Sequence, residues 1–313
     1  MQLHQNSGNW RLGLALSLLT VLLWGILPIA LSIALQAVDV YTLTWFRFLL
    51  SFALLVIYLG VRNQLPKIST LRSPTFKLLA TSTIFLAINY LLFVQGLAQT
   101  SANNAEVLIQ IAPVIFGLGA IAFFKEKYTV QQWIGFAVLT LGFSVFFHEQ
   151  LNNLLTAPRK YLVGSGLLVI AAVAWAIYAL AQKQLLQKLS SFSIMLFIYG
   201  GCSVLFAPFA KPQLIFSLSL FHLAALVFCG LNTLIAYGAF AEALEHWQAS
   251  KVSAVLALAP IVTLISVDFV SAIAPQVIKP ENLTFLGIIG AIMVVSGSMA
   301  IALGKSPHPP RSS

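Results

Sequence analysis

The sequence predicts an all-α integral membrane protein with ten transmembrane helices, and three observations lead to this prediction. Of the 313 residues, 59% are hydrophobic and 8% are charged, whereas a soluble globular protein carries about a quarter charged residues. The mean hydropathy is +0.94. Apolar runs recur along the whole chain, and most are close to the roughly 20 residues that a helix needs to cross the hydrocarbon layer.

Most of the predicted helices are runs without any charged residue. These runs are Leu12–Val38, Leu78–Ala105, Val107–Phe124, Tyr128–Phe147, Tyr161–Gln182, Leu189–Ala210 and Asn282–Gly304. Further runs are interrupted by ionisable residues: Val40–Leu59 contains Arg47, Leu220–Ala241 has His222 near its start, and Ala249–Ala274 contains Lys251 and Asp268. Together they give ten helices, and we expect no second domain.

The first run is expected to be a retained helix. Met1–Trp10 is polar and short, and the apolar run after it is longer than the apolar region of a signal peptide. Cys202 and Cys229 both fall inside predicted helices, where cysteine usually serves as a small buried hydrophobic residue. We therefore expect no disulfide framework, no metal site and no cofactor.

The basic residues predict the orientation in the membrane, since loops on the cytoplasmic side carry an excess of Lys and Arg. With both termini inside, the cytoplasmic set is Arg11, Arg62, Lys67, Arg72, Lys77, Lys125, Lys127, Lys183, Lys188, Lys251, Lys305 and Arg311. The external set is then Arg159, Lys160, Lys211 and Lys279. The net charge of +9 is therefore read as a topology signal in a lipid bilayer, and we expect no nucleic-acid partner.

A shift of 147 residues aligns the second half of the chain with the first. It places Ala102, Ala112 and Pro113 on Ala249, Ala259 and Pro260, and Tyr90, Phe93 and Leu97 on Tyr237, Phe240 and Leu244. Further matches lie in a drifting register, with Trp24 near Trp175 and the seven-residue spacing of Gly135 and Gly142 repeated by Gly290 and Gly297. Matches in the same order indicate an internal duplication.

Five helices are an odd number of crossings, so two consecutive copies must lie upside down relative to one another. Inverted repeats of this kind are typical of secondary transporters, which hold the substrate near the bilayer midplane between the repeats. The predicted segments are a cytoplasmic segment 1–11, a first repeat 12–147, an external linker 148–160, a second repeat 161–304 and a cytoplasmic tail 305–313.

The chain resembles the EamA-type carriers of the drug/metabolite transporter superfamily over nearly its whole length. In the first half, the marks are Trp24-Gly25 with Pro28, Arg47-Phe48, the segment Ala102–Pro113, Lys125-Glu126, and Gln132–Gly135 with Gly142. In the second half they are Trp175–Tyr178, Ala236-Tyr237, and Ala249–Ser253 with Pro260. The chain departs from the pattern at Ile273, where the family often carries an acidic residue.

The resemblance implies ten helices around a central cavity and export of small metabolites. We expect a plasma (inner) membrane carrier that exports amino acids or related metabolites by alternating access, works as a monomer and is not an enzyme. Protons are a candidate coupling ion. A sugar-phosphate or nucleotide-sugar-like carrier and a passive channel or scramblase stay open as alternatives.

Ionisable residues at membrane depth are the first candidates for the binding site, because an unpaired charge there costs at least a few kcal/mol. Arg47 and Glu106 lie at similar depths, roughly 8–10 Å below the outer surface at 1.5 Å per residue. One interpretation is a structural ion pair between the two helices. The other makes Arg47 a clamp for an anionic group of the substrate and Glu106 its counter-ion or a proton carrier.

Other candidate side chains are polar or aromatic residues within helices. Asn103, Glu106, Gln110 and Pro113 follow steps of three and four, which places them on one helical face. The remaining binding candidates are Trp24, Asn89, Tyr90, Trp175, Tyr178 and Tyr237. The alternative for all of them is helix packing. Pro28, Pro113 and Pro260 remove backbone hydrogen bonds inside helices, and we interpret them either as gating bends or as static kinks.

Overall fold

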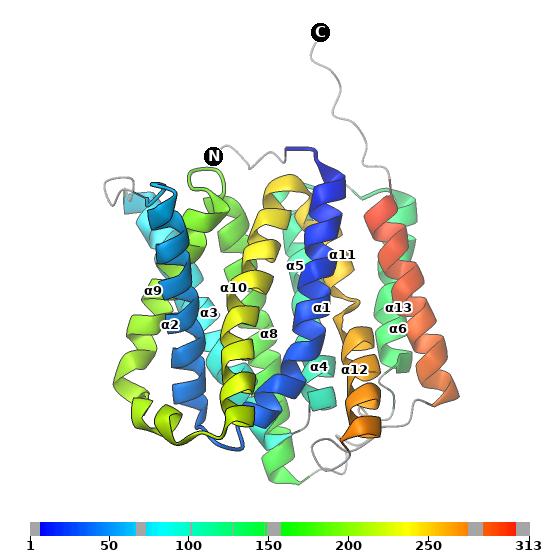
Figure 1. The fold of residues 1–313 in the computed structure, drawn as a ribbon. Coiled ribbons are helices and arrows are strands. Elements are labelled where there is room, and N and C mark those ends of the chain that lie inside the picture. Colours follow the sequence, from blue (N-terminus) through cyan, green and yellow to red (C-terminus); the bar gives the residue numbers. More distant parts are fainter. Residues whose placement is uncertain are drawn as a thin grey trace.

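The computed structural model describes residues 7–66, 73–100, 102–126, 128–146, 148, 158–274 and 284–304. Within these ranges the secondary structure is helical and contains no β-strand. Nine helices of the described residues are long and apolar enough to cross a membrane, and Val130–Phe146 is a shorter apolar helix. This count takes Asn104–Phe124 and Ala249–Ile273 as one crossing each, although both are broken inside. The helices stand side by side in one bundle (Figure 1).

The helix bounds follow the predicted runs with small shifts at the ends. The first half contains α1 (Trp10–Ala34), α2 (Val40–Val61), α3 (Ser73–Gln99), α4 (Ala102–Ile109), α5 (Ile111–Phe124) and α6 (Val130–Phe146). The second half contains α8 (Arg159–Leu185), α9 (Ser191–Phe206), α10 (Leu220–His246), α11 (Ala249–Leu256), α12 (Ala259–Ile273) and α13 (Phe285–Leu303), with the short 3-10 helices η2 (Ala207–Phe209) and η3 (Pro212–Ser217) after α9.

One predicted run is wrong as a single helix. Leu78–Ala105 is divided, because α3 ends at Gln99 and α4 begins at Ala102. Several predicted features lie outside the described residues: Lys67, Arg72, Lys127, Lys279, Lys305, Arg311, the tail 305–313 and most of the segments 1–11 and 148–160.

The central helices of both halves are broken at corresponding places. α4 and α5 are separated at Gln110, and α11 and α12 are separated at Ala257 and Leu258. A proline follows each break, Pro113 in α5 and Pro260 in α12, and proline cannot donate the backbone hydrogen bond that would continue the helix. The bounds of α11 lie 147 residues after those of α4. Figure 1 shows that the two broken helices run in opposite directions, with α5 above α4 and α11 above α12.

The main packing contacts join the two halves of the chain. α1 packs against α10, α3 against α8, α2 against α9, α6 against α13, α5 against α11 and α4 against α12. If every helix is replaced by its counterpart in the other half, the same pairs of helices result; for example, α1 with α10 becomes α8 with α3. The pattern therefore has the symmetry expected of two structurally equivalent halves.

Glycines bring α6 and α13 into backbone contact. A Cβ atom on Gly297 would lie 2.6 Å from the carbonyl oxygen of Gly135, and a Cβ atom on Gly142 would lie 3.1 Å from that of Gly290. A Cβ atom on Gly290 would lie 2.3 Å from the backbone nitrogen of Phe146. Small residues at such interfaces allow membrane helices to approach closely. The two glycine pairs with a spacing of seven thus face each other across one interface.

The start of α1 and the end of α13 lie at the same end of the bundle, which we call the termini end (Figure 1). Large apolar side chains cover the outside of the helices, for example Ile57, Ile134, Ile265 and Ile292, each about 60% exposed or slightly more. An exposed apolar surface on this scale belongs in lipid. The chain is a multi-pass membrane protein.

Candidate functional site

A central cavity of about 90 Å³ lies where the two halves meet. A single buried water needs roughly 10–15 Å³ of such space, so the cavity has room for several waters or part of a small ligand. Its wall is made by α1, α2, α3, α4, α5, α8, α10, α11 and α12. The lining residues are Trp24, Leu27, Pro28, Arg47, Asn89, Tyr90, Phe93, Glu106, Ile109, Gln110, Ala112, Pro113, Trp175, Tyr237, Leu256 and Ala259.

Arg47 enters the cavity from α2 and is held in place by the second half of the chain. Its Nε donates a hydrogen bond of 2.9 Å to Thr233 Oγ1 on α10. The guanidinium carbon lies 4.4 Å from the centre of the Tyr90 ring, a distance at which a cation is attracted to the ring face. Arg47 is 2% exposed. These contacts fix the plane of the guanidinium group.

Glu106 reaches the same cavity from α4. Its Oε1 accepts a hydrogen bond of 3.0 Å from Gln110 Nε2, one helical turn later. Within the part of the chain that the structure describes, no ion pair joins Arg47 to Glu106. The structural ion pair is therefore not formed here, because Arg47 turns toward Thr233 and Tyr90 while Glu106 turns toward Gln110.

Aromatic side chains form one wall of the cavity. The centre of the Trp24 ring lies 5.6 Å from that of Trp175, 5.0 Å from that of Tyr237 and 5.7 Å from that of Phe240. Tyr90 lies 5.4 Å from Tyr237 in the same measure. Edge-to-face and tilted pairs at these distances stabilise one another. They give the cavity an apolar surface beside its polar residues.

Two polar atoms of the cavity wall have no hydrogen-bond partner among the described residues. They are the indole nitrogen of Trp24 and Oε1 of Gln110. A buried polar atom left unsatisfied costs about 1–3 kcal/mol, so a ligand that pairs with both is favoured. The amide of Asn89, in contrast, already donates 2.9 Å to the carbonyl oxygen of Ala171.

Most of the predicted site residues meet in this cavity. Trp24, Arg47, Asn89, Tyr90, Glu106, Gln110, Trp175 and Tyr237 line it, as do Pro28 and Pro113. Tyr178 does not line it and is buried behind the wall, against Trp175 and Tyr237. Pro260 is buried next to the lining residue Ala259, and the side chain of Asn103 lies outside the described residues.

The cavity also contains residues that were not predicted. Leu27, Ile109 and Leu256 line it, but an apolar residue in an apolar helix carries no signal that distinguishes a cavity wall from a lipid contact. Thr233, which positions Arg47, was missed for a similar reason, since a lone hydroxyl in a helix commonly bonds to its own backbone, as Thr233 also does to Cys229.

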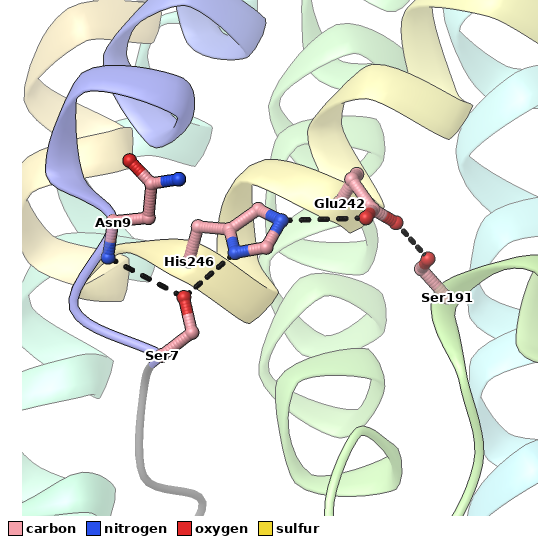
Figure 2. A network of polar contacts seen from close by, with 5 residues as sticks. All are labelled: Ser7, Asn9, Ser191, Glu242 and His246. Carbon is pink, nitrogen blue, oxygen red and sulfur yellow. Dashed lines mark hydrogen bonds and ion pairs between the residues drawn. The ribbon is translucent and has the colours of Figure 1, made fainter.

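A second polar cluster lies at the termini end (Figure 2), and none of its residues lines the cavity. His246 Nε2 lies 3.3 Å from Glu242 Oε1, and its Nδ1 is 2.7 Å from the hydroxyl of Ser7. Ser191 donates to the other oxygen of Glu242. This network ties the segment before α1 to α10 and α9. Lys251 is not part of it, since its Nζ donates 2.8 Å to the carbonyl oxygen of Gly304.

A family model and several similar proteins all indicate a transporter. The family model described as "EamA-like transporter family" matches residues 11–147 and 162–303. An "Uncharacterized inner membrane transporter YhbE" of Escherichia coli K12 is 38% identical over 294 residues, which cover 94% of this chain and 92% of that protein. An "Uncharacterized transporter" of Haemophilus influenzae is 33% identical over 299 residues, which cover 95% and 97%.

More distant matches concern function and fold separately. A "Probable amino-acid metabolite efflux pump" of Escherichia coli K12 is 24% identical over 296 residues, covering 90% of this chain and 92% of that protein. A crystal structure of another protein superimposes with a TM-score of 0.71 at 17% identity, covering 93% of this chain and 97% of that one, and supports the fold alone. With a family match over both halves and relatives above 30% identity along nearly the whole length, the chain belongs to the EamA-like transporter family.

Proposed function

We propose that this protein is a secondary transporter of the plasma (inner) membrane that exports amino acids or related small metabolites. The observation that carries the proposal is the pairing of opposite charges in one cavity. Among the described lining residues, Arg47 is the one cation and Glu106 the one anion, and neither neutralises the other. A zwitterionic amino acid brings a carboxylate for Arg47 and an ammonium group for Glu106.

The remaining wall suits the rest of such a substrate. A guanidinium group binds a carboxylate through two parallel hydrogen bonds, and the free Oε1 of Gln110 adds an acceptor beside Glu106. The rings of Trp24, Trp175 and Tyr237 offer an apolar surface to the side chain. The relative named an amino-acid metabolite efflux pump supports the same substrate class. A sugar phosphate would need more cations than Arg47 alone.

We infer alternating access between two inverted five-helix halves as the mechanism. The opposite directions of the two broken helices and the symmetric packing partners support it (Figure 1). The breaks before Pro113 and Pro260 leave two places where a helix bends without losing further hydrogen bonds. The termini end is assigned to the cytoplasm on the excess of Lys and Arg, and one chain contains the whole cavity, as a monomeric carrier requires.

Proton coupling would operate through Glu106. The Glu106 carboxylate accepts a hydrogen bond from Gln110 and forms no ion pair among the described residues. It can therefore become neutral by taking up a proton. The empty carrier can then return with Glu106 protonated, and the proton is carried inward in place of the exported substrate. Export of one substrate would be exchanged for entry of one proton.

The test is counterflow in liposomes. The purified protein is reconstituted and given labelled amino acids and metabolites, with and without an imposed pH gradient. Saturable exchange that responds to the gradient supports a proton-coupled carrier, and saturable exchange that ignores it supports a facilitator. Unsaturable leak would identify a channel or scramblase, and saturable exchange of sugar phosphates alone would replace the proposed substrate class.

A further inference from the structure

Glu126 connects the two halves of the chain at the termini end. Its Oε1 accepts the backbone N–H of Ala249 at 3.0 Å, and its Oε2 accepts that of Ser250 at 3.0 Å. These are the first two N–H groups of α11, whose N-cap residue Gln248 makes no side-chain cap of its own. A residue from the end of α5 in the first half therefore caps a helix of the second half.

We propose that Glu126 is a latch that holds the cytoplasmic end of the transporter closed. The inference rests on the proposed alternating access, in which the ends of α5 and α11 must separate to open the cavity to the cytoplasm. A carboxylate at a helix N-terminus is stabilised by the hydrogen bonds and by the positive end of the helix dipole. Opening this end would break both bonds and expose the carboxylate.

Glu126 bonds across the two halves and has two lysines of the second half near it. Lys183 and Lys251 both interact electrostatically with Glu126. Each lysine donates to the end of a helix in its own half: Lys183 Nζ to the carbonyl oxygen of Trp247 at 3.2 Å, and Lys251 Nζ to that of Gly304 at 2.8 Å. These two bonds join elements of the second half, whereas the bonds of Glu126 join the first half to the second.

The packing around the latch is close. A Cβ atom on Gly117 of α5 would lie 2.8 Å from Ser253 Oγ of α11, so the absent side chain allows the helices to touch. The Tyr128 hydroxyl forms a hydrogen bond with Ser250, and burial raises the pKa of Tyr128 to about 12, which keeps it neutral. The described residues at this end thus pack closely across the two halves.

At the opposite end, the position equivalent to Glu126 holds no carboxylate. The 147-residue shift that aligns α4 with α11 places Glu126 on Ile273 and the start of α11 on Ala102. Ile273 is 68% exposed and has no side-chain acceptor for an N–H group. Ile273 therefore cannot form the closing bond that Glu126 forms, and within the described residues the latch favours one of the two states. The resting transporter should be closed to the cytoplasm and open to the outside.

Thiol labelling from each side of the membrane tests the latch. A cysteine replaces Leu256, which lines the cavity near the latch, and the native Cys202 and Cys229 are 0% exposed. An impermeant maleimide is applied to inside-out and right-side-out vesicles. In this background, Glu126→Gln should raise the labelling rate from the cytoplasmic side by about five-fold, the effect of losing one helix cap. Lys125→Gln, one residue away and exposed, should leave the rate unchanged.

A second variant tests the opposite end. Ile273→Glu places a carboxylate at the position equivalent to Glu126 and should lower labelling from the outside. The latch would be refuted if Glu126→Gln lowered the melting temperature but left labelling from both sides unchanged, or if Lys125→Gln raised labelling as much. Labelling needs no substrate. A parent protein that shows no counterflow would therefore contradict the proposed function, and the labelling rates would still test the latch.

Discussion

Thr233 controls the position of Arg47 without touching the cavity itself, and Thr233→Val isolates that role. Thr233 is 0% exposed and accepts from Arg47 Nε at 2.9 Å and from the Tyr90 hydroxyl at 3.4 Å. Valine has nearly the same shape but no acceptor. A hydrogen bond to a charged group contributes about 1.5–3 kcal/mol, and part of the loss can be recovered when the guanidinium turns away.

We therefore expect the variant to weaken substrate binding by about 1–2 kcal/mol, a roughly five- to thirty-fold rise in the half-saturating concentration. The measurement is the concentration dependence of counterflow for the best substrate of the panel. Thr20→Val is the matched control, since Thr20 is also 0% exposed and bonds to the carbonyl oxygens of Leu16 and Ala236 at the α1–α10 contact. Equal effects of both variants, or none from Thr233→Val, would refute the positioning of Arg47.

Three further predictions test other parts of the site and fold. Glu106→Gln keeps the hydrogen bond from Gln110 but removes the partner of the substrate's ammonium group, so counterflow at equal pH should need more substrate and should no longer respond to a pH gradient; an unchanged response would remove Glu106 as the proton carrier. Trp24→Leu should weaken binding of aromatic substrates by about 0.5–1.5 kcal/mol, and Trp24→Phe by less, in the same saturation curves; equal affinities would show that the ring is packing only. Gly290→Ala should destabilise the protein by about 1–3 kcal/mol in detergent melting curves, whereas Gly238→Ala, with nothing within 4 Å of its added Cβ, should not.

The sequence was sufficient to predict the helices because charge and hydropathy mark their ends. It failed where no such mark exists: the turn after Gln99 contains no charged residue, so the run Leu78–Ala105 looked continuous. The breaks in the central helices lie close to the two prolines that repeat after 147 residues. Their correspondence was visible in the sequence, but the division of each helix into two was not.

The sequence pointed to most of the residues that line the cavity but not to their contacts. Steps of 1.5 Å per residue placed Arg47 and Glu106 at one level, and both line the cavity. The direction in which each side chain turns depends on partners such as Thr233, which is 186 residues away from Arg47. Glu126 was seen only as a mark of the family, because its partners are backbone N–H groups, and these have no signature in a sequence.

The exchange of packing partners between the halves has a consequence for biosynthesis. α1 finds its main partner in α10, and α3 finds its partner in α8, so the first half enters the bilayer with the faces meant for these helices still covered by lipid. Its helices can cross the membrane one by one, but their final packing must wait until α10 has been inserted. A ribosome that stops after α6 would leave a set of correctly inserted helices without a stable tertiary structure.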